Sequence, residues 1–187
     1  MNLSHSKLTD WGLGHLSVGK SDTILDVGCG GGRTVSKLAA LASEGNVYGV
    51  DYSEASVAAS RSMNASEIEA GRVEIVQGTV SALPFGDGVF DLVTGVETHF
   101  FWPDLPGDLR EVFRVTKRGG GLVLIAEVYA GMKTRTAKMI EERMPKLGLK
   151  LLTVDEHREL LESAGFVDVR VEGEEAKGWI CAVGRKR

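Results

Sequence analysis

The sequence predicts an α/β fold, a doubly wound and mostly parallel sheet with helices on both faces. Short apolar runs alternate with segments of helical periodicity, which is the pattern of βαβ units. The run Leu122–Ala126 is apolar throughout, as expected of a strand buried on both faces. The first apolar run, Thr23–Val27, ends in a glycine cluster that leads into a helical pattern. We therefore expect a ligand to bind at the turn after the first strand.

Length and composition fit one globular domain that spans residues 1–187. Hydrophobic residues make up 43% of the chain and charged residues 26%, which suits a soluble fold with a real core. The net charge of -4 does not favour non-specific binding to nucleic acid. Cys29 and Cys181 have no paired spacing, which argues against a metal site and a disulfide framework. The chain shows no signal peptide and no apolar run that could span a bilayer, so we expect a cytoplasmic protein without a membrane partner.

The elements follow one another in the order that a parallel sheet requires. Residues 1–20 contain a helical pattern in which Leu8 and Trp11 share one face. A Thr153 cap with Glu156 as its partner predicts the start of the last helix. Strands are expected at 23–27, 46–50, 73–77, 90–96, 122–126, 166–171 and 178–183, helices at 34–41, 53–65, 105–116 and 153–163, and a glycine-rich turn at 117–121.

Segment 129–152 is expected to form a helical cap. Lysines and arginines outnumber glutamates in it, and its methionines fall near helical spacing. A basic, methionine-rich face would steer an anionic substrate and adapt to its shape. The alternative is a solvated helix that covers the edge of the sheet, and the sequence leaves both open.

The glycine cluster and its neighbours separate the classes of nucleotide-binding turn. In the dinucleotide pattern a third glycine lies inside the helix, but Arg33 holds that position when the count starts at Gly28. No Gly-Lys-Ser/Thr follows, which excludes a P-loop. Asp26 would repel a diphosphate and attract an ammonium group, unless it merely caps the turn. Asp51, about 20 residues past the glycines, stands where a carboxylate binds a ribose diol, which predicts an adenosine ligand without choosing the cofactor.

Several motifs match one enzyme family. The stretch Asp26-Val27-Gly28-Cys29-Gly30-Gly31-Gly32 resembles the first motif of the class I S-adenosylmethionine-dependent methyltransferases, an acidic residue followed by x-Gly-x-Gly-x-Gly. Leu83-Pro84-Phe85 and Phe90-Asp91-Leu92-Val93 are similar to motifs of the small-molecule branch, the type 11 methyltransferase domain. The Asn-Pro-Pro-Tyr or Asp-Pro-Pro-Tyr motif of the amide and adenine N-methylating branches is absent. The resemblance implies a Rossmann-like, seven-stranded sheet whose last strand is antiparallel.

The resemblance also implies how S-adenosylmethionine would be bound. Asp26 would hold the methionine ammonium, Asp51 the ribose hydroxyls, and Tyr52 would lie near the base. Thr79 stands where the family has an aspartate that contacts the adenine amino group, and a hydroxyl accepts that bond more weakly. The Val80 N–H is the candidate donor to the adenine ring. The expected cofactor-binding residues are Asp26, Gly28, Cys29, Gly30, Gly32, Asp51, Tyr52, Thr79, Val80 and Glu97.

The implied activity is methyl transfer to a small-molecule nucleophile by in-line displacement, with oxygen, nitrogen, carbon and sulfur all open as acceptor atoms. His99 is the candidate general base, since an imidazole of pKa about 6.5 transfers protons at neutral pH. Catalysis without any base is the alternative. Phe100, Phe101 and Trp102 either line an apolar acceptor pocket or pack the next helix.

The N-terminal helix and the remaining functions also have alternatives. In the family such a helix often covers the cofactor cleft, so His5 and Trp11 either form part of a lid or, in the case of Trp11, pack the helix on the sheet. Two other functions are considered: binding of S-adenosylmethionine or S-adenosylhomocysteine without turnover, and NAD-dependent oxidoreduction, which Arg33 and the closing strand pair disfavour. We expect a monomer or homodimer, an anionic or partly apolar methyl acceptor, no nucleic-acid partner and no metal.

Overall fold

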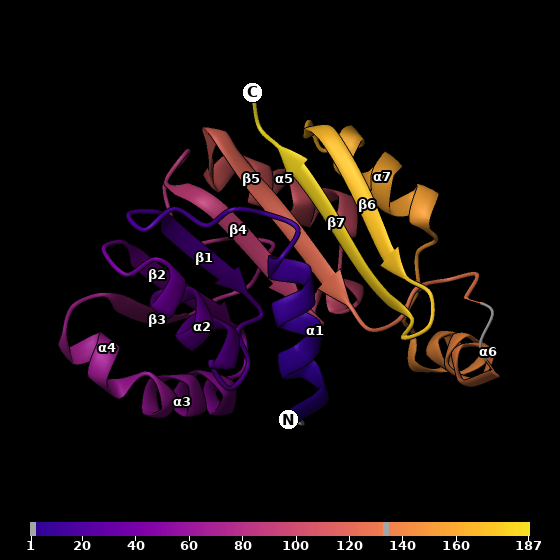
Figure 1. Cartoon of the computed structure of the whole chain (residues 1–187), viewed down its shortest axis with the longest axis horizontal. Coiled ribbons are helices and arrows are strands. Elements are labelled where there is room, and N and C mark those ends of the chain that lie inside the picture. Colours follow the sequence, from indigo (N-terminus) through magenta and orange to yellow (C-terminus); the bar gives the residue numbers. More distant parts are fainter. Residues whose placement is uncertain (1–2, 133–134) are drawn as a thin grey trace.

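A single mixed sheet organises the chain, for which the computed structural model describes residues 3–132 and 135–187. Seven strands lie in the order β3-β2-β1-β4-β5-β7-β6 (Figure 1). All neighbouring pairs from β3 to β5 are parallel, whereas β7 runs antiparallel to both β5 and β6. The doubly wound, mostly parallel sheet with an antiparallel last strand is therefore confirmed. The strands are β1 (Thr23–Val27), β2 (Asn46–Asp51), β3 (Val73–Gln77), β4 (Phe90–Val96), β5 (Thr116–Ala126), β6 (Val167–Glu174) and β7 (Trp179–Arg185).

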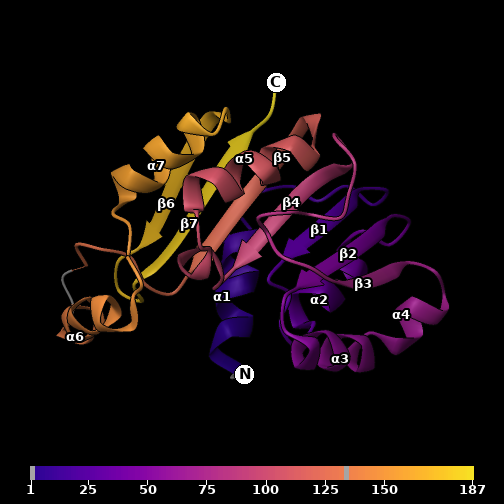
Figure 2. The ribbon, with the colours of Figure 1, turned by 180° about the vertical axis from the view of Figure 1, so that it is seen from behind.

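Helices cover both faces of this sheet, because successive residues of a buried strand point to opposite sides. Ile24 packs into a cluster with α1 and α2, while its neighbour Leu25 packs into a cluster with α5 and α7 on the other face. Figure 2 shows α5 and α7 in front, on the side away from α1. The helices are α1 (Leu3–Leu13), α2 (Arg33–Leu41), α3 (Glu54–Met63), α4 (Ala65–Glu69), α5 (Leu105–Val115), α6 (Arg135–Arg143) and α7 (Val154–Ser163), with short 3-10 turns η1 (His99–Phe101) and η2 (Met144–Leu147).

The N-terminal helix α1 packs directly on the sheet. Leu8 is fully buried, and the Trp11 ring lies 5.7 Å from the ring of Trp179 on β7. The Lys37 ammonium on α2 donates to the Ser6 carbonyl at 3.0 Å and ties the two helices together. The packing interpretation of Trp11 is therefore the one that the contacts favour. The lid remains a prediction, and the side chain of His5 lies outside the described part of the chain.

Two elements differ from the sequence-based expectation. The predicted turn 117–121 belongs to β5, whose pairing with β4 jumps from Phe90↔Thr116 to Leu92↔Gly121, so the extra residues bulge out of the ladder. The expected helix 53–65 divides into α3 and α4 at Asn64, whose side-chain amide donates to carbonyls of Gly32 and Ser60. By contrast, the capping box of Thr153 and Glu156 at the start of α7 is present as predicted.

Segment 129–152 contains α6 and η2, and its role as a substrate cap stays a prediction. The side chains of Lys133, Arg135 and Lys138, on which the anionic-substrate hypothesis depends, lie outside the described residues. Lys150 forms an ion pair with Glu156 at 2.8 Å. Among the residues that are described, no helix is both long enough and apolar enough to cross a membrane.

Candidate functional site

A turn of left-handed glycines joins β1 to α2 at the carboxyl edge of the sheet. Gly28, Gly30 and Gly32 have φ of 74°, 52° and 82°, a region that other residues rarely adopt. A Cβ on Gly28 would lie 2.1 Å from the Thr98 hydroxyl oxygen, and one on Gly32 would lie 2.5 Å from polar atoms of α3 and the residue after it. The turn therefore presents bare backbone, close to which a ligand can lie.

Asp51 ties this turn to the end of β2. One carboxylate oxygen accepts a hydrogen bond from the Gly30 N–H and the other accepts from the Ser53 N–H, each at 2.9 Å. Asp51 is 8% exposed, so it lies almost entirely below the surface. Each oxygen has a further lone pair, which leaves the carboxylate able to accept from a ligand hydroxyl.

Asp26 lies beneath the turn and is 2% exposed. Its carboxylate accepts from the Thr94 hydroxyl on the neighbouring strand at 2.6 Å. Burial raises the pKa of Asp26 to about 7, the Thr94 hydrogen bond lowers it, and the nearby charge of Asp51 adds to the increase. Near neutral pH the ionised form of this group is therefore costly in the absence of a positive partner.

Glu97 occupies the corresponding place at the end of β4. It has a φ of 56°, which is uncommon for a residue with a side chain. Its carboxylate accepts from the N–H of Glu127 at the end of β5. Burial raises the pKa of Glu97 to about 7, the hydrogen bond from Glu127 lowers it, and the Glu127 charge raises it. A left-handed residue at the end of a strand aims a side chain that regular geometry would place elsewhere.

The topology thus brings three carboxylates to one edge of the sheet. Asp26, Asp51 and Glu97 come from β1, β2 and the end of β4, and β1 lies between the other two strands. Within the described residues, none of the three forms an ion pair with a lysine or arginine. An unneutralised acidic site repels a diphosphate and suits a ligand that carries positive charge.

The other predicted cofactor residues divide by exposure. Tyr52 is 77% exposed beside Asp51, and Thr79 is exposed in the loop after β3. The Val80 side chain is buried in the core. The Cys29 side chain also points into the core, with its sulfur 3.8 Å from the Ser60 hydroxyl, and burial raises its pKa to about 12. Only the backbone of Cys29 is available at the turn.

His99 lies in the interior and contacts a second histidine. It is 3% exposed, and its Nε2 lies 3.1 Å from Nε2 of His157 on α7. Nδ1 of His157 lies 2.7 Å from the Thr153 carbonyl, which can only accept, so His157 is protonated at Nδ1 and His99 donates through Nε2. Burial and the neighbouring His157 lower the pKa of His99 far below its ordinary value. Its burial and low basicity make His99 a poor acceptor for a proton from a ligand, so the structure does not favour it as the general base.

The aromatic residues that follow His99 in the chain differ in burial. Trp102 is 9% exposed, packs in the core with α5, and donates through its indole N–H to the Thr98 hydroxyl at 3.2 Å. Phe101 is 59% exposed, and its ring lies 4.7 Å from the ring of Phe100. Trp102 therefore follows the packing alternative, while Phe101 is free to contact a ligand.

Sequence reasoning missed the polar residues that support the carboxylates. Thr94 is fully buried in β4 and stands directly across from Asp26 in the register of β1 and β4. Thr98 lies against Gly28. A signal was present for Thr94, since a polar residue within the apolar run of each of two adjacent strands indicates a buried pair.

Comparison with known proteins identifies the family. The family profile described as a methyltransferase domain matches residues 25–124, more than half of the chain. The chain belongs to this methyltransferase family. It is thus an S-adenosylmethionine-dependent methyltransferase, as its motifs predicted, and not a nicotinamide-dependent oxidoreductase. The match spans the glycine turn and all three carboxylates of the site.

Relatives and solved structures agree with this assignment. The chain is 23% identical over its whole length to the uncharacterized methyltransferase YdaC of Bacillus subtilis (strain 168), covering 95% of that protein. It is 31% identical to the demethylmenaquinone methyltransferase of Geobacillus kaustophilus (strain HTA426), covering 90% of this chain and 80% of the relative. The geranyl diphosphate C-methyltransferase of Streptomyces coelicolor A3(2), solved with Mg²⁺, geranyl diphosphate and S-adenosyl-L-homocysteine, has the same fold, with a TM-score of 0.78, 16% identity and coverage of 97% and 79% of the two chains.

Proposed function

We propose that this methyltransferase transfers a methyl group from S-adenosylmethionine to a small-molecule nucleophile. The observation that carries the proposal is a group of carboxylates around a left-handed glycine turn, the buried Asp26 and Asp51 and the partly buried Glu97, with no basic partner among the described residues. S-adenosylmethionine, when bound, supplies a methyl group on a sulfonium centre, which a nucleophile takes by in-line displacement.

The residues at this edge fit the parts of that cofactor. Asp51, with an acceptor lone pair left on each oxygen, would bind the ribose hydroxyls. Asp26 and Glu97 would lower the free energy of the cation by ionising next to it, since both have a pKa near 7. The exposed ring of Tyr52 and the Thr79 hydroxyl would contact the base, with the Val80 N–H as a donor. The cofactor would also contact the backbone of the glycine turn, at Gly28, Cys29, Gly30 and Gly32.

The chain's contribution to catalysis is positioning. His99 is buried against His157 and is only weakly basic there, so we propose that no side-chain base takes part. Holding two reactants in line contributes about 7–11 kcal/mol to lowering a barrier. Such a site suits a nucleophile that is already ionised or intrinsically reactive, because it asks for no proton transfer.

We further propose that the acceptor is partly apolar. Phe101 is exposed at the carboxyl end of β4, and Met139 on α6 is 66% exposed. Phe101 follows the carboxyl end of β4, and α6 follows β5 in the chain. Ligands of open α/β sheets bind at the carboxyl ends of such strands. The demethylmenaquinone and geranyl diphosphate methyltransferases named above are similar proteins that, by their names, act on small molecules.

Two measurements test the proposal in turn. Calorimetric titration with S-adenosylhomocysteine and with NAD should give binding of the first alone, and binding of NAD alone would overturn it. Radiolabelled methyl transfer over a metabolite panel, with and without apolar groups, should then give turnover. Cofactor binding without transfer to any acceptor in such a panel would support the alternative, a protein that binds the cofactor without catalysis.

A further inference from the structure

A cavity of about 670 Å³ lies at the opposite edge of the sheet from the carboxylates. It is formed where β1, β4 and β5 begin and β7 ends, together with the loop that leaves α1. The cofactor residues lie at the carboxyl ends of the same parallel strands, so a ligand in this cavity would be separate from the methyl-transfer site. The volume falls within the range of about 300–1,000 Å³ that small-molecule sites occupy.

Bare backbone forms one wall of the cavity. The bulge in β5 places Gly119, Gly120 and Gly121 there, and Gly184 of β7 lies beside them. A Cβ on Gly120 would lie 2.8 Å from the carbonyl oxygen of Asp91, and one on Gly121 would lie 3.2 Å from that of Gly184. At Gly120 and Gly121 the neighbouring backbone thus leaves no room for a side chain.

The acidic residues of the cavity already have donors within the protein. Asp91 accepts from the Thr23 N–H and from the Lys117 ammonium, each at 2.8 Å. Asp22 accepts from the Gly19 N–H at 2.7 Å. Asp22 thus closes the turn before β1, and Asp91 joins the start of β1 to Lys117 of β5. Among the described residues, neither carboxylate forms an ion pair with the arginines of the cavity.

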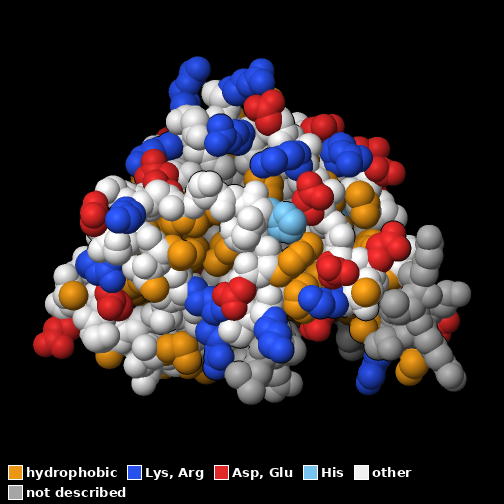
Figure 3. Space-filling view, viewed as in Figure 1, with side chains coloured by type: hydrophobic (Ala, Val, Ile, Leu, Met, Phe, Trp, Pro, Cys, Tyr) orange, Lys and Arg blue, Asp and Glu red, His pale blue; other side chains and the backbone are white. Residues whose placement is uncertain are grey.

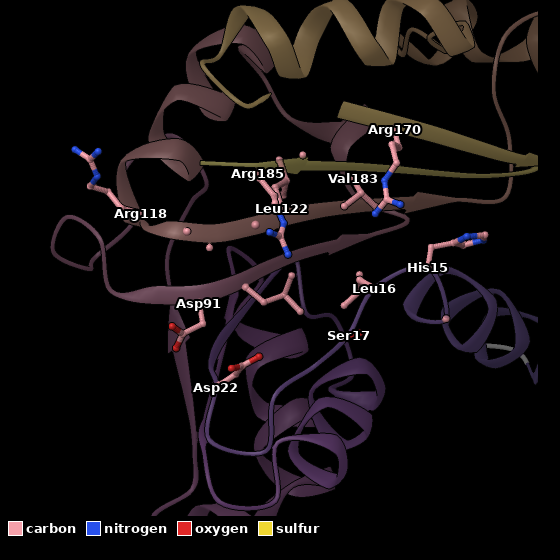
Figure 4. Close-up of a pocket in the computed structure, with 16 residues that line it drawn as sticks. His15, Leu16, Ser17, Asp22, Asp91, Arg118, Leu122, Arg170, Val183 and Arg185 are labelled. Carbon is pink, nitrogen blue, oxygen red and sulfur yellow. The ribbon is translucent and has the colours of Figure 1, made fainter. Parts of the chain in front are cut away.

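Three arginines also line this cavity. Figure 4 shows Arg170 and Arg185 extending from β6 and β7 toward the loop of Leu16 and Ser17, with Arg118 at the far end of the cavity. No ion pair of these three arginines occurs among the described residues, whereas Arg114 and Arg187 each pair with a carboxylate. Figure 3 shows several lysines and arginines over this end of the molecule, with aspartates and glutamates between them.

We propose that this cavity binds a small polyanion that carries phosphate or carboxylate groups. A guanidinium group offers paired N–H donors that match the oxygens of either group, and an anion between Arg170 and Arg185 would relieve their mutual repulsion. Arg118 would contact a second anionic group at the other end, which is why we infer a ligand with at least two such groups. The inference does not depend on the methyl acceptor or on the cofactor.

Calorimetry at low ionic strength tests the proposal with pyrophosphate and citrate as probes. We expect at least one probe to bind, with an affinity that falls as sodium chloride is added. The double variant Arg170→Gln/Arg185→Gln should weaken binding by about tenfold or more, because it removes both charged donor pairs. Arg110→Gln is the matched control, since Arg110 is exposed on α5 and does not line the cavity. Thermal unfolding of each variant checks that the fold is retained.

The outcomes separate the proposal from its alternatives. Binding that is lost in the double variant and kept in Arg110→Gln supports a polyanion site. Absence of binding by both probes, or equal affinity in all variants, overturns it. A hexaglutamate peptide that binds where both small probes fail would also overturn it, in favour of an acidic segment of a partner protein.

Discussion

Lowering the pH from about 8 to about 6 should weaken the binding of S-adenosylhomocysteine by about tenfold or more. The reason is that burial raises the pKa of Asp26 and of Glu97 to about 7. A carboxyl group is about 90% ionised one unit above its pKa and about 10% ionised one unit below it. A ligand ammonium that requires one ionised carboxylate therefore loses about tenfold in affinity, and about a hundredfold if it requires both.

The assay is isothermal titration calorimetry at both pH values, repeated in two buffers of different ionisation enthalpy. The buffer dependence counts the protons released on binding, and we expect release near neutral pH. The double variant Asp26→Asn/Glu97→Gln should bind more weakly at high pH and lose the pH dependence, because neither amide titrates. Asp87→Asn is the matched control, since Asp87 is exposed at the turn before β4. Equal affinity of the wild-type protein at both pH values, or an unchanged profile in the double variant, would refute the reasoning.

Three further predictions concern Asp51, the glycine turn and the buried histidine pair. Asp51→Ala should weaken S-adenosylhomocysteine binding by more than about tenfold in calorimetry, through loss of a charged acceptor, and an unchanged affinity would mean that the ribose lies elsewhere. Gly28→Ala should lower the thermal midpoint far more than Gly71→Ala, since both have left-handed φ but only the first brings a Cβ into contact, and equal midpoints would contradict this. Burial lowers the pKa of His99 and His157, so below about pH 6.5 the unfolded chain binds protons that the folded chain does not. The free energy of unfolding therefore decreases as the pH is lowered, by up to about 1.4 kcal/mol per pH unit for each histidine. Urea unfolding of His99→Phe/His157→Leu should show a shallower fall than the wild-type protein, whereas parallel profiles would count against the buried neutral pair.

Most of the sheet could be predicted from the sequence because its strands are locally encoded. The runs that became β1 to β4 are apolar, short and bounded by turn residues, so their local pattern and their tertiary environment agree. The segment 117–121 was wrongly predicted as a turn because its glycines indicate one locally. Its strand character comes from a distant partner, since the Gly119 N–H donates to the Lys186 carbonyl at 2.7 Å and the Lys186 N–H donates to Gly120 at 3.0 Å.

The candidate site shows the same division between local and distant signals. The positions of Asp26 and Asp51 followed from the glycine turn and from chain spacing, and both lie at the carboxyl edge as expected. The contact between His99 and His157 depends on how α7 packs against η1, which no local pattern records. The arginines that line the cavity at the opposite edge come from β6, β7 and the bulge of β5, so only the completed sheet places them around one cavity.

The place of β7 inside the sheet has a consequence for how the protein is made. This strand lies between β5 and β6, although it follows both in the chain, and Ala126 pairs with Ile180. During synthesis the edge of β5 stays unpaired until β7 has emerged. The strands β1 to β4, at which the candidate functional site lies, can already pair with one another. An open apolar edge recruits strands from other chains. Slow translation across β6 and β7 would therefore raise the risk of aggregation more than equal slowing elsewhere.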